Sequence, residues 1–218
     1  MARPALAVDV VSDMVCPWCR IGWAQLARAL NDLGVEATVR WRPFRLAPDA
    51  PEEEGEAIEA YLQRRYGPDA AVPAAGRATL RALAEEAGVP FLHGVRLRMW
   101  NTARAHRLLW WAAPSGRQTR LAEALFEAHF DRGARLSDPA VLVAAAEAAG
   151  LDPDAAARAL QDPAVAAAVA ASERHARASG VAGVPTFVFD GRLAVVGAQG
   201  PATFTRLIAR WLERRPSP

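Results

Sequence analysis

The chain has 218 residues, of which about half are hydrophobic, and a formal net charge of +2. This length fits one large domain, or one domain with a sizeable insertion, and the apolar content is enough for a core without crosslinks. The basic side chains, all Arg apart from four His, are interleaved with acidic residues, so no nucleic-acid-binding surface is predicted. No secretory signal or membrane span is recognisable, which predicts a cytoplasmic protein without membrane contact.

The amino-terminal part of the chain has the pattern of a β-α-β unit. Leu6–Ser12 is apolar and β-branched and predicts a buried strand. Apolar residues then recur at helical spacing from Pro17 to about Asn31, and Pro17 suits the first helical position. Glu36–Arg42 alternates polar and apolar residues and predicts a second strand, which joins the first through a right-handed crossover.

The middle of the chain has helical periodicity, interrupted by Gly and Pro. Asp138-Pro139 and Asp152-Pro153 are typical of an N-cap followed by a first-turn proline. The predicted helices are Glu54–Tyr66, Ala74–Ala87, Thr102–Ala112, Arg117–Phe130, Pro139–Ala149, Asp154–Leu160 and Pro163–Ala178.

The carboxyl-terminal part returns to strands and ends in a helix. Thr186–Phe189 and Leu193–Val196 predict two strands joined by a hairpin at Asp190-Gly191. A final helix is predicted after Gly200-Pro201. We therefore expect an α/β domain formed by residues 1–54 plus 180–218, interrupted by a helical insertion at residues 55–179.

The chain contains only two cysteines, Cys16 and Cys19, in a Cys-Pro-Trp-Cys motif. A secreted disulfide scaffold has more cysteines, and a structural zinc site needs four ligands, so no metal site is predicted. No Gly-rich phosphate-binding loop is present, so no cofactor is predicted either. A redox pair is the remaining interpretation, with two inert buried cysteines as the alternative.

The position of the motif predicts which thiol attacks and which resolves in thiol–disulfide exchange. Cys16 falls between a strand and a helix, where free backbone N–H groups stabilise a thiolate. We therefore expect Cys16 to be the more exposed, attacking thiol and Cys19, one turn further on, to be the resolving thiol. Gly183-Val184-Pro185-Thr186 precedes a strand, where a proline is tolerated, so by itself Pro185 is interpreted as a strand-initiating proline.

Together these motifs resemble the thioredoxin superfamily, and more closely its DsbA branch, over nearly the whole chain. The resemblance implies a thioredoxin-like fold with a large all-helical insertion. It also implies that the Val184–Pro185 bond is cis, that Pro185 packs against Cys16 and Cys19, and that the Val184 backbone hydrogen-bonds to substrate. The expected function is that of a protein thiol–disulfide oxidoreductase or isomerase acting on protein thiols or disulfides, with glutathione as a possible redox partner.

Within this branch the chain is most similar to the FrnE-like subgroup. The similarity rests on further motifs, which are Ser12-Asp13, Ile21-Gly22, Trp41-x-Pro43-Phe44-x-Leu46-x-Pro48, Asn101-Thr102-x-x-Ala105-His106 and Gly197-Ala198-Gln199. Some FrnE-like proteins carry a second cysteine pair, which this chain lacks.

The branch also resembles kappa-type glutathione transferases and 2-hydroxychromene-2-carboxylate isomerases. Those enzymes have Ser at the position of Cys16, so a glutathione-dependent isomerase or transferase is the alternative function. Pro17 and Trp18 are expected to contact the substrate. Asn101 and His106 either line the cleft and hold a peptide or glutathione, or serve as a helix cap and an interior hydrogen-bonding residue. The sequence makes no prediction of the oligomeric state.

Overall fold

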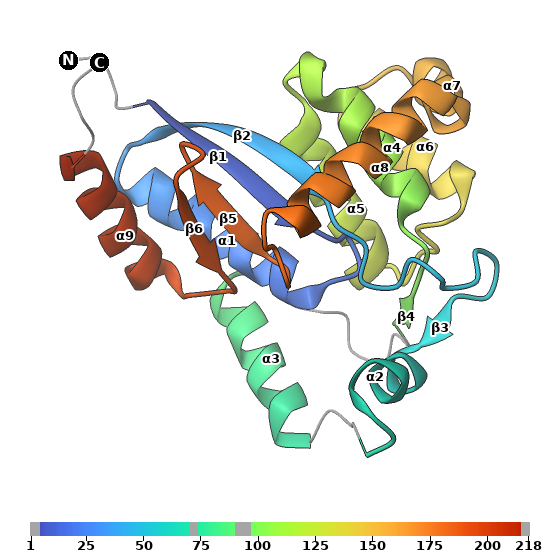
Figure 1. Ribbon diagram of the computed structural model, residues 1–218, viewed down its shortest axis with the longest axis horizontal. Coiled ribbons are helices and arrows are strands. Elements are labelled where there is room, and N and C mark those ends of the chain that lie inside the picture. The colour runs from blue at the N-terminus through green and yellow to red at the C-terminus, as the bar shows by residue number, and fades with distance from the viewer. Residues whose placement is uncertain (1–4, 70–73, 90–96, 215–218) are drawn as a thin grey trace.

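The computed structural model describes residues 5–69, 74–89 and 97–214. A four-stranded mixed sheet in the order β2-β1-β5-β6 forms its centre (Figure 1). β1 (Ala5–Ser12) is parallel to β2 (Glu36–Pro43) and antiparallel to β5 (Thr186–Phe189). β6 (Leu193–Val196) pairs antiparallel with β5 and completes the sheet. All four strands confirm the predicted ones to within one residue at each end.

One face of the sheet is covered by two helices that lie side by side, α1 (Pro17–Asp32) and α9 (Pro201–Arg214). Leu6, Val8 and Val10 alternate along β1 and are buried in the core. Phe187 of β5 meets Phe204 of α9 edge to face, with ring centroids 5.2 Å apart. This aromatic contact places α9 on the sheet beside α1.

In the described part of the chain between β2 and β5 there are seven α-helices, as the sequence predicts for an insertion. They are α2 (Ile58–Tyr66), α3 (Ala74–Glu86), α4 (Ala103–Ala112), α5 (Gln118–Phe130), α6 (Pro139–Ala148), α7 (Pro153–Gln161) and α8 (Pro163–Ala178). Asp138 and Asp152 accept hydrogen bonds from backbone N–H groups in the first turns of α6 and α7, so both predicted caps are confirmed.

The insertion differs from the prediction at one place. The predicted helix from Glu54 begins only at Ile58, because Glu56–Ala57 forms a short strand, β3, that pairs with β4 (Arg98–Met99). Gly55 precedes β3 with a φ of +63°, a conformation outside the helical region. Within the described residues of the insertion, this ribbon of two short strands is the only β-structure. The domain limits at residues 54 and 180 remain predictions.

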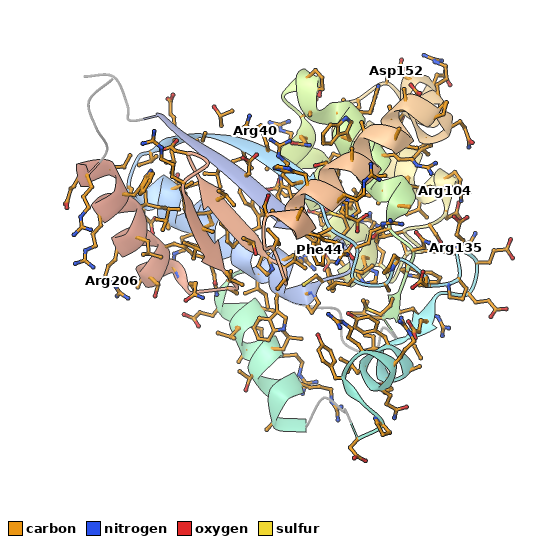
Figure 2. All side chains as sticks on the ribbon, in the orientation of Figure 1. Arg40, Phe44, Arg104, Arg135, Asp152 and Arg206 are labelled. Atoms are coloured by element: carbon orange, nitrogen blue, oxygen red, sulfur yellow. The ribbon has the colours of Figure 1, made fainter. Side chains whose placement is uncertain are left out.

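Three helices of the insertion, α4, α5 and α8, contact β2 of the sheet, and named side chains make some of these contacts. Gln118 of α5 accepts a hydrogen bond from Trp41 N–H at 2.9 Å and donates one to Trp41 O at 3.2 Å, so its amide pairs with the free edge of β2. Directly after β2, Phe44 packs with Val11 of β1 and Ala176 of α8. Figure 2 shows Phe44 near the end of α8. These contacts hold the helical insertion next to the end of β1.

Among the residues that the structure describes, no helix has the length and apolar character needed to cross a bilayer.

Candidate functional site

The two cysteines lie where β1 leads into α1. Cys16 is the N-cap residue of α1 and its N–H donates to Asp13 O at 3.1 Å. Cys19 lies in the first turn, and its N–H donates to Cys16 O at 3.1 Å. Both cysteines are free thiols. Proline at the first helical position sacrifices no hydrogen bond, so the sequence Cys-Pro-Trp-Cys folds into this turn without an unpaired donor at Pro17.

The exposure of the two thiols differs less than the sequence predicts. Cys16 is 3% exposed and Cys19 is 0% exposed, so the order is the predicted one but Cys16 is also buried. The reason is that Cys16 belongs to the apolar core cluster, together with its neighbours Met14 and Val15.

Burial raises the pKa of the Cys19 thiol well above its ordinary value. The hydrogen bond with Cys16 and the charge of Cys16 raise it further, because a second anion beside the first is unfavourable. The Ser12 hydroxyl and the Asp13 backbone act on Cys19 in the opposite direction, with smaller effects. In the reduced protein Cys19 is therefore held as the neutral thiol.

The loop before β5 faces the redox pair from the far end of the sequence. The Val184–Pro185 bond is cis, as predicted. The Cys16 Sγ lies 3.8 Å from Val184 O, a contact between residues 168 positions apart. A Cβ atom on Gly22 would lie 3.1 Å from Pro185 Cγ, so the glycine allows α1 and this loop to approach closely. The antiparallel pairing of β5 with β1 brings the loop to this position.

Of the predicted substrate-contacting residues near the motif, Trp18 is the most open. Its side chain is 39% exposed, whereas Pro17 and Val184 are half-buried and Pro185 is buried. Trp18 therefore offers an apolar surface beside the buried thiol.

Asn101 and His106 lie at the start of α4, and Asn101 makes the contacts expected of a helix cap. Asn101 Oδ1 accepts from Ala103 N–H at 3.1 Å, and its Nδ2 donates to Pro48 O at 2.9 Å. The amide thus joins the helix start to the loop after β2. His106 is buried, and its Nε2 lies 3.4 Å from Asp13 Oδ1.

A comparison with known families identifies the chain. The family model described as DSBA-like thioredoxin domain matches residues 7–209. The chain belongs to this family.

Solved structures agree with this assignment. The probable DsbA oxidoreductase SCO1869 from Streptomyces coelicolor is 33% identical, with a TM-score of 0.84, over 98% of this chain and 93% of that chain. The 2-hydroxychromene-2-carboxylate isomerase shares the fold at 20% identity and a TM-score of 0.68, over 95% of this chain and 97% of that chain. The cytosolic disulfide reductase DsbM from Pseudomonas aeruginosa, solved with GSH, also shares the fold. It is 19% identical, with a TM-score of 0.61, over 95% of this chain and 99% of that chain.

The structure of this DsbA-like protein also shows residues near the thiols that sequence reasoning missed. Arg20, directly after Cys19, forms a two-pronged ion pair with Asp131 at 2.6 and 2.9 Å and joins α1 to the end of α5. Tyr61 of α2 is buried, and burial raises its pKa, with smaller contributions that include Asp13 and Cys16. Only the position of Arg20 next to the motif was a signal in the sequence; Tyr61 had none.

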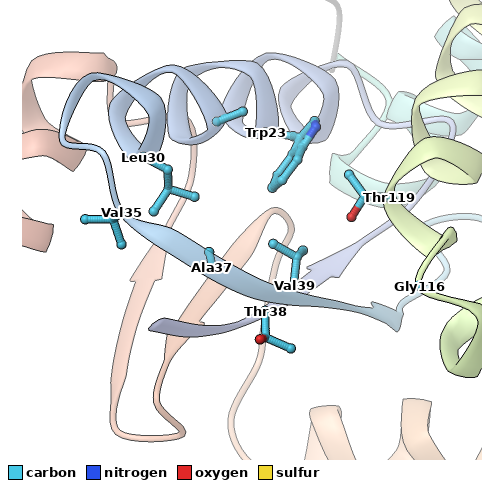
Figure 3. Close-up of a pocket in the computed structure, with 9 residues that line it drawn as sticks. Trp23, Leu30, Val35, Ala37, Thr38, Val39, Gly116 and Thr119 are labelled. Carbon is cyan, nitrogen blue, oxygen red and sulfur yellow. The ribbon is translucent and has the colours of Figure 1, made fainter. Parts of the chain in front are cut away.

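One hollow of the DsbA-like protein lies away from the thiols (Figure 3). It measures about 460 Å³ and is bounded by α1, the edge of β2 and the α4–α5 connection, with Trp23, Leu30 and Val39 among its lining. Because its lining includes neither cysteine, this hollow is not the site of thiol chemistry. In the described ranges, no three His, Cys, Asp or Glu side chains are grouped as metal ligands would be.

Proposed function

We propose that this DsbA-like protein is a thiol–disulfide oxidoreductase in which Cys16 attacks and Cys19 resolves. The observation that carries the proposal is the position of the Cys16 sulfur, at the amino end of α1 and 3.8 Å from Val184 O. The amino end of a helix stabilises negative charge, so an attacking thiolate is expected at Cys16. Cys19 is held as the neutral thiol until an adduct has formed on Cys16.

The reaction has two exchange steps. The Cys16 thiolate attacks a substrate disulfide, a bond forms between Cys16 and one substrate sulfur, and the other sulfur leaves as a thiolate. Cys19 then loses its proton and attacks the Cys16 sulfur, which forms the Cys16–Cys19 disulfide and releases the second substrate thiolate. Two electrons pass from the protein to the substrate, and the same steps in reverse oxidise a dithiol.

The substrates we propose are protein thiols or disulfides, with glutathione as the small redox partner. Trp18 supplies an exposed apolar contact, which suits an unfolded or extended polypeptide. The Val184 carbonyl next to Cys16 provides a backbone acceptor for an N–H of such a chain. DsbM, which shares the fold, was solved with GSH. We also propose that the protein belongs to the FrnE-like subgroup and is located in the cytoplasm.

Single cysteine variants test the proposal. After exposure to oxidised glutathione, Cys19→Ser is expected to retain one glutathione on Cys16, because attack remains possible and resolution does not. Cys16→Ser is expected to retain none, because Ser lacks the nucleophilicity of a thiolate and Cys19 is buried and neutral. Intact-mass spectrometry and an insulin-reduction assay measure both.

The assigned roles would be wrong if Cys16→Ser formed the adduct on Cys19 as readily as Cys19→Ser forms it on Cys16. The glutathione-dependent isomerase or transferase is the alternative, and it rests on the fold shared with the 2-hydroxychromene-2-carboxylate isomerase. If the protein is such an enzyme, Cys16→Ser is expected to keep glutathione-dependent activity on 2-hydroxychromene-2-carboxylate. If it is an oxidoreductase, Cys16→Ser is expected to lose its activity.

A further inference from the structure

The outer edge of β2 is closed at Trp41 and open beside it. At Trp41 the Gln118 amide takes the position of a neighbouring strand, because it bonds both the N–H and the carbonyl of that residue. Backbone groups of a strand point to alternate sides, so the N–H and carbonyl of Ala37 and Val39 point to the same edge. Within the described ranges, these groups have no hydrogen-bond partner at that edge. This part of β2 is therefore open to pairing with a further strand.

The hollow next to this edge lies on the side that the side chains of an added strand would enter. Figure 3 shows Ala37 and Val39 on the α1 side of β2 and Thr38 on the opposite side. In antiparallel pairing, residues directly opposite each other project to the same face. The residues opposite Ala37 and Val39 would therefore enter the hollow, where Trp23 and Leu30 are part of the lining. Its volume of about 460 Å³ is that of a ligand pocket, and this lining suits apolar side chains.

On the other face of β2, the charges favour an acidic residue at one position. Arg40 and Arg42 share the Asp9 carboxylate, with N–O distances of 3.1 and 2.8 Å, so one negative charge faces two positive ones. The Arg40 side chain is 52% exposed, and its guanidinium can take a second carboxylate from a residue paired opposite it. Glu36 is exposed on the same face at the other end of the open edge and disfavours an acidic residue there. These charges set the direction of an added strand.

The open length of the edge suits a short segment of another protein. A second copy of β2 paired along the whole edge would need the place opposite Trp41, which the Gln118 amide fills. A chain that pairs only between Arg40 and Ala37 avoids that place. Strand addition of this kind obtains its affinity from main-chain hydrogen bonds and its selectivity from alternate side chains.

We propose that the β2 edge from Ala37 to Arg40, with the hollow beside it, binds an extended segment of a partner protein in antiparallel pairing. Read from its amino end, the segment has an acidic residue opposite Arg40, then an apolar, a polar and a second apolar residue. The acidic residue pairs with the Arg40 guanidinium, and the two apolar side chains enter the hollow. The surface lies away from the thiols, so the inference goes beyond the proposed function and does not depend on it.

A synthetic peptide tests the backbone pairing. The probe is fluorescein-labelled Gly-Ser-Glu-Val-Thr-Leu-Gly-amide, added to the full-length protein, and fluorescence anisotropy gives its affinity. In the proposed pairing the amide N–H of the peptide's Val points at β2, and that of its Thr points away. N-methylation of the Val amide is expected to weaken binding at least about tenfold, because a hydrogen bond is lost and the methyl group meets the edge, whereas N-methylation of the Thr amide is expected to change it less than about threefold.

An exchange of charges tests the contact with Arg40. Replacing the peptide's Glu by Lys is expected to weaken binding to the wild type about fivefold, and Arg40→Glu is expected to prefer the Lys peptide by a similar factor. A variant that folded poorly would bind both peptides less, so only a reversed preference reports the charge contact. Arg206→Glu, which changes an exposed arginine on α9, is the matched control and is expected to keep the preference of the wild type.

Backbone amide NMR signals locate the bound peptide. The signals of Ala37 and Val39 are expected to shift, and those of Cys16 and Val184 are expected to stay in place. The proposal would be overturned by shifts centred on Cys16 and Val184, by equal affinity of the peptide methylated at Val, by an unchanged preference of Arg40→Glu, or by no binding up to about 1 mM peptide. A free protein that sediments as a dimer with Ala37 and Val39 protected from amide exchange would overturn it too, because a second copy would then occupy the edge.

Discussion

His129 makes the stability of this protein dependent on pH. The imidazole lies in α5, is 1% exposed and meets Phe130 with ring centroids 4.6 Å apart. Burial lowers the pKa of His129 from 6.5 to about 4, and Arg20 acts in the same direction, while Asp13 and the Ala134 carbonyl oppose them. Between these two pKa values the unfolded chain binds a proton that the folded protein does not, so stability falls as the pH is lowered.

The size of the effect follows from the shift. A displacement of about 2.5 pKa units corresponds to about 3 kcal/mol, fully present above pH 6.5 and lost by about pH 4. At pH 5 about 2 kcal/mol of this should be gone, while most carboxylates are still ionised. The neutral ring is thus compatible with its site, and the charged ring is not.

The perturbation that tests this is His129→Phe, which keeps an aromatic ring and removes the titration. Urea unfolding at pH 7, 6 and 5 gives the free energy of unfolding for both proteins. The wild type is expected to lose about 2 kcal/mol more than the variant between pH 7 and pH 5. Carboxylates titrate alike in both proteins and cancel in the comparison. An equal loss in the two proteins would show that His129 is not the group responsible.

Three further substitutions have defined outcomes. Gly22→Ala places a Cβ 3.1 Å from Pro185 Cγ, so we expect it to cost about 1–3 kcal/mol in urea unfolding and to slow adduct formation on Cys16; unchanged values of both would contradict the close approach. Gln118→Leu leaves the Trp41 N–H and carbonyl without their partner and should cost about 3 kcal/mol, whereas a loss below about 0.5 kcal/mol would mean that the edge contact is unimportant. Trp18→Ala should change the free energy of unfolding by less than about 0.5 kcal/mol, since Trp18 is 39% exposed. In steady-state assays the same variant should raise the KM for a protein substrate more than the KM for glutathione. Equal effects on the two substrates would argue against contact between Trp18 and a polypeptide.

Strands and helices of this protein were predictable where the signal is local. The hairpin at Asp190-Gly191 and the proline-capped helices were found because turn and cap residues act on their immediate neighbours. β3 was missed because two residues carry no periodicity, and its partner Arg98–Met99 lies about forty positions away in the sequence.

The candidate site was predictable in the same sense. Cys16, Cys19 and the cis bond at Pro185 follow from motifs, the last through the family resemblance. The facing of Asp13 and His106 was not foreseen, because it depends on how α4 packs against the end of β1. The burial of Cys16 was also missed, since it depends on the packing of the core cluster to which Cys16 belongs.

The contact between Cys16 and Val184 has a consequence for the order in which the site is assembled during synthesis. The two residues are 168 positions apart, and at about 5–20 residues per second roughly 10–30 s pass between their appearances on the ribosome. Over that time the dithiol exists without the loop that contains Val184, and β1 lacks its neighbour β5. A nascent chain of this protein is therefore itself a polypeptide with two unshielded thiols, open to the same exchange reactions that the finished protein is proposed to carry out on others.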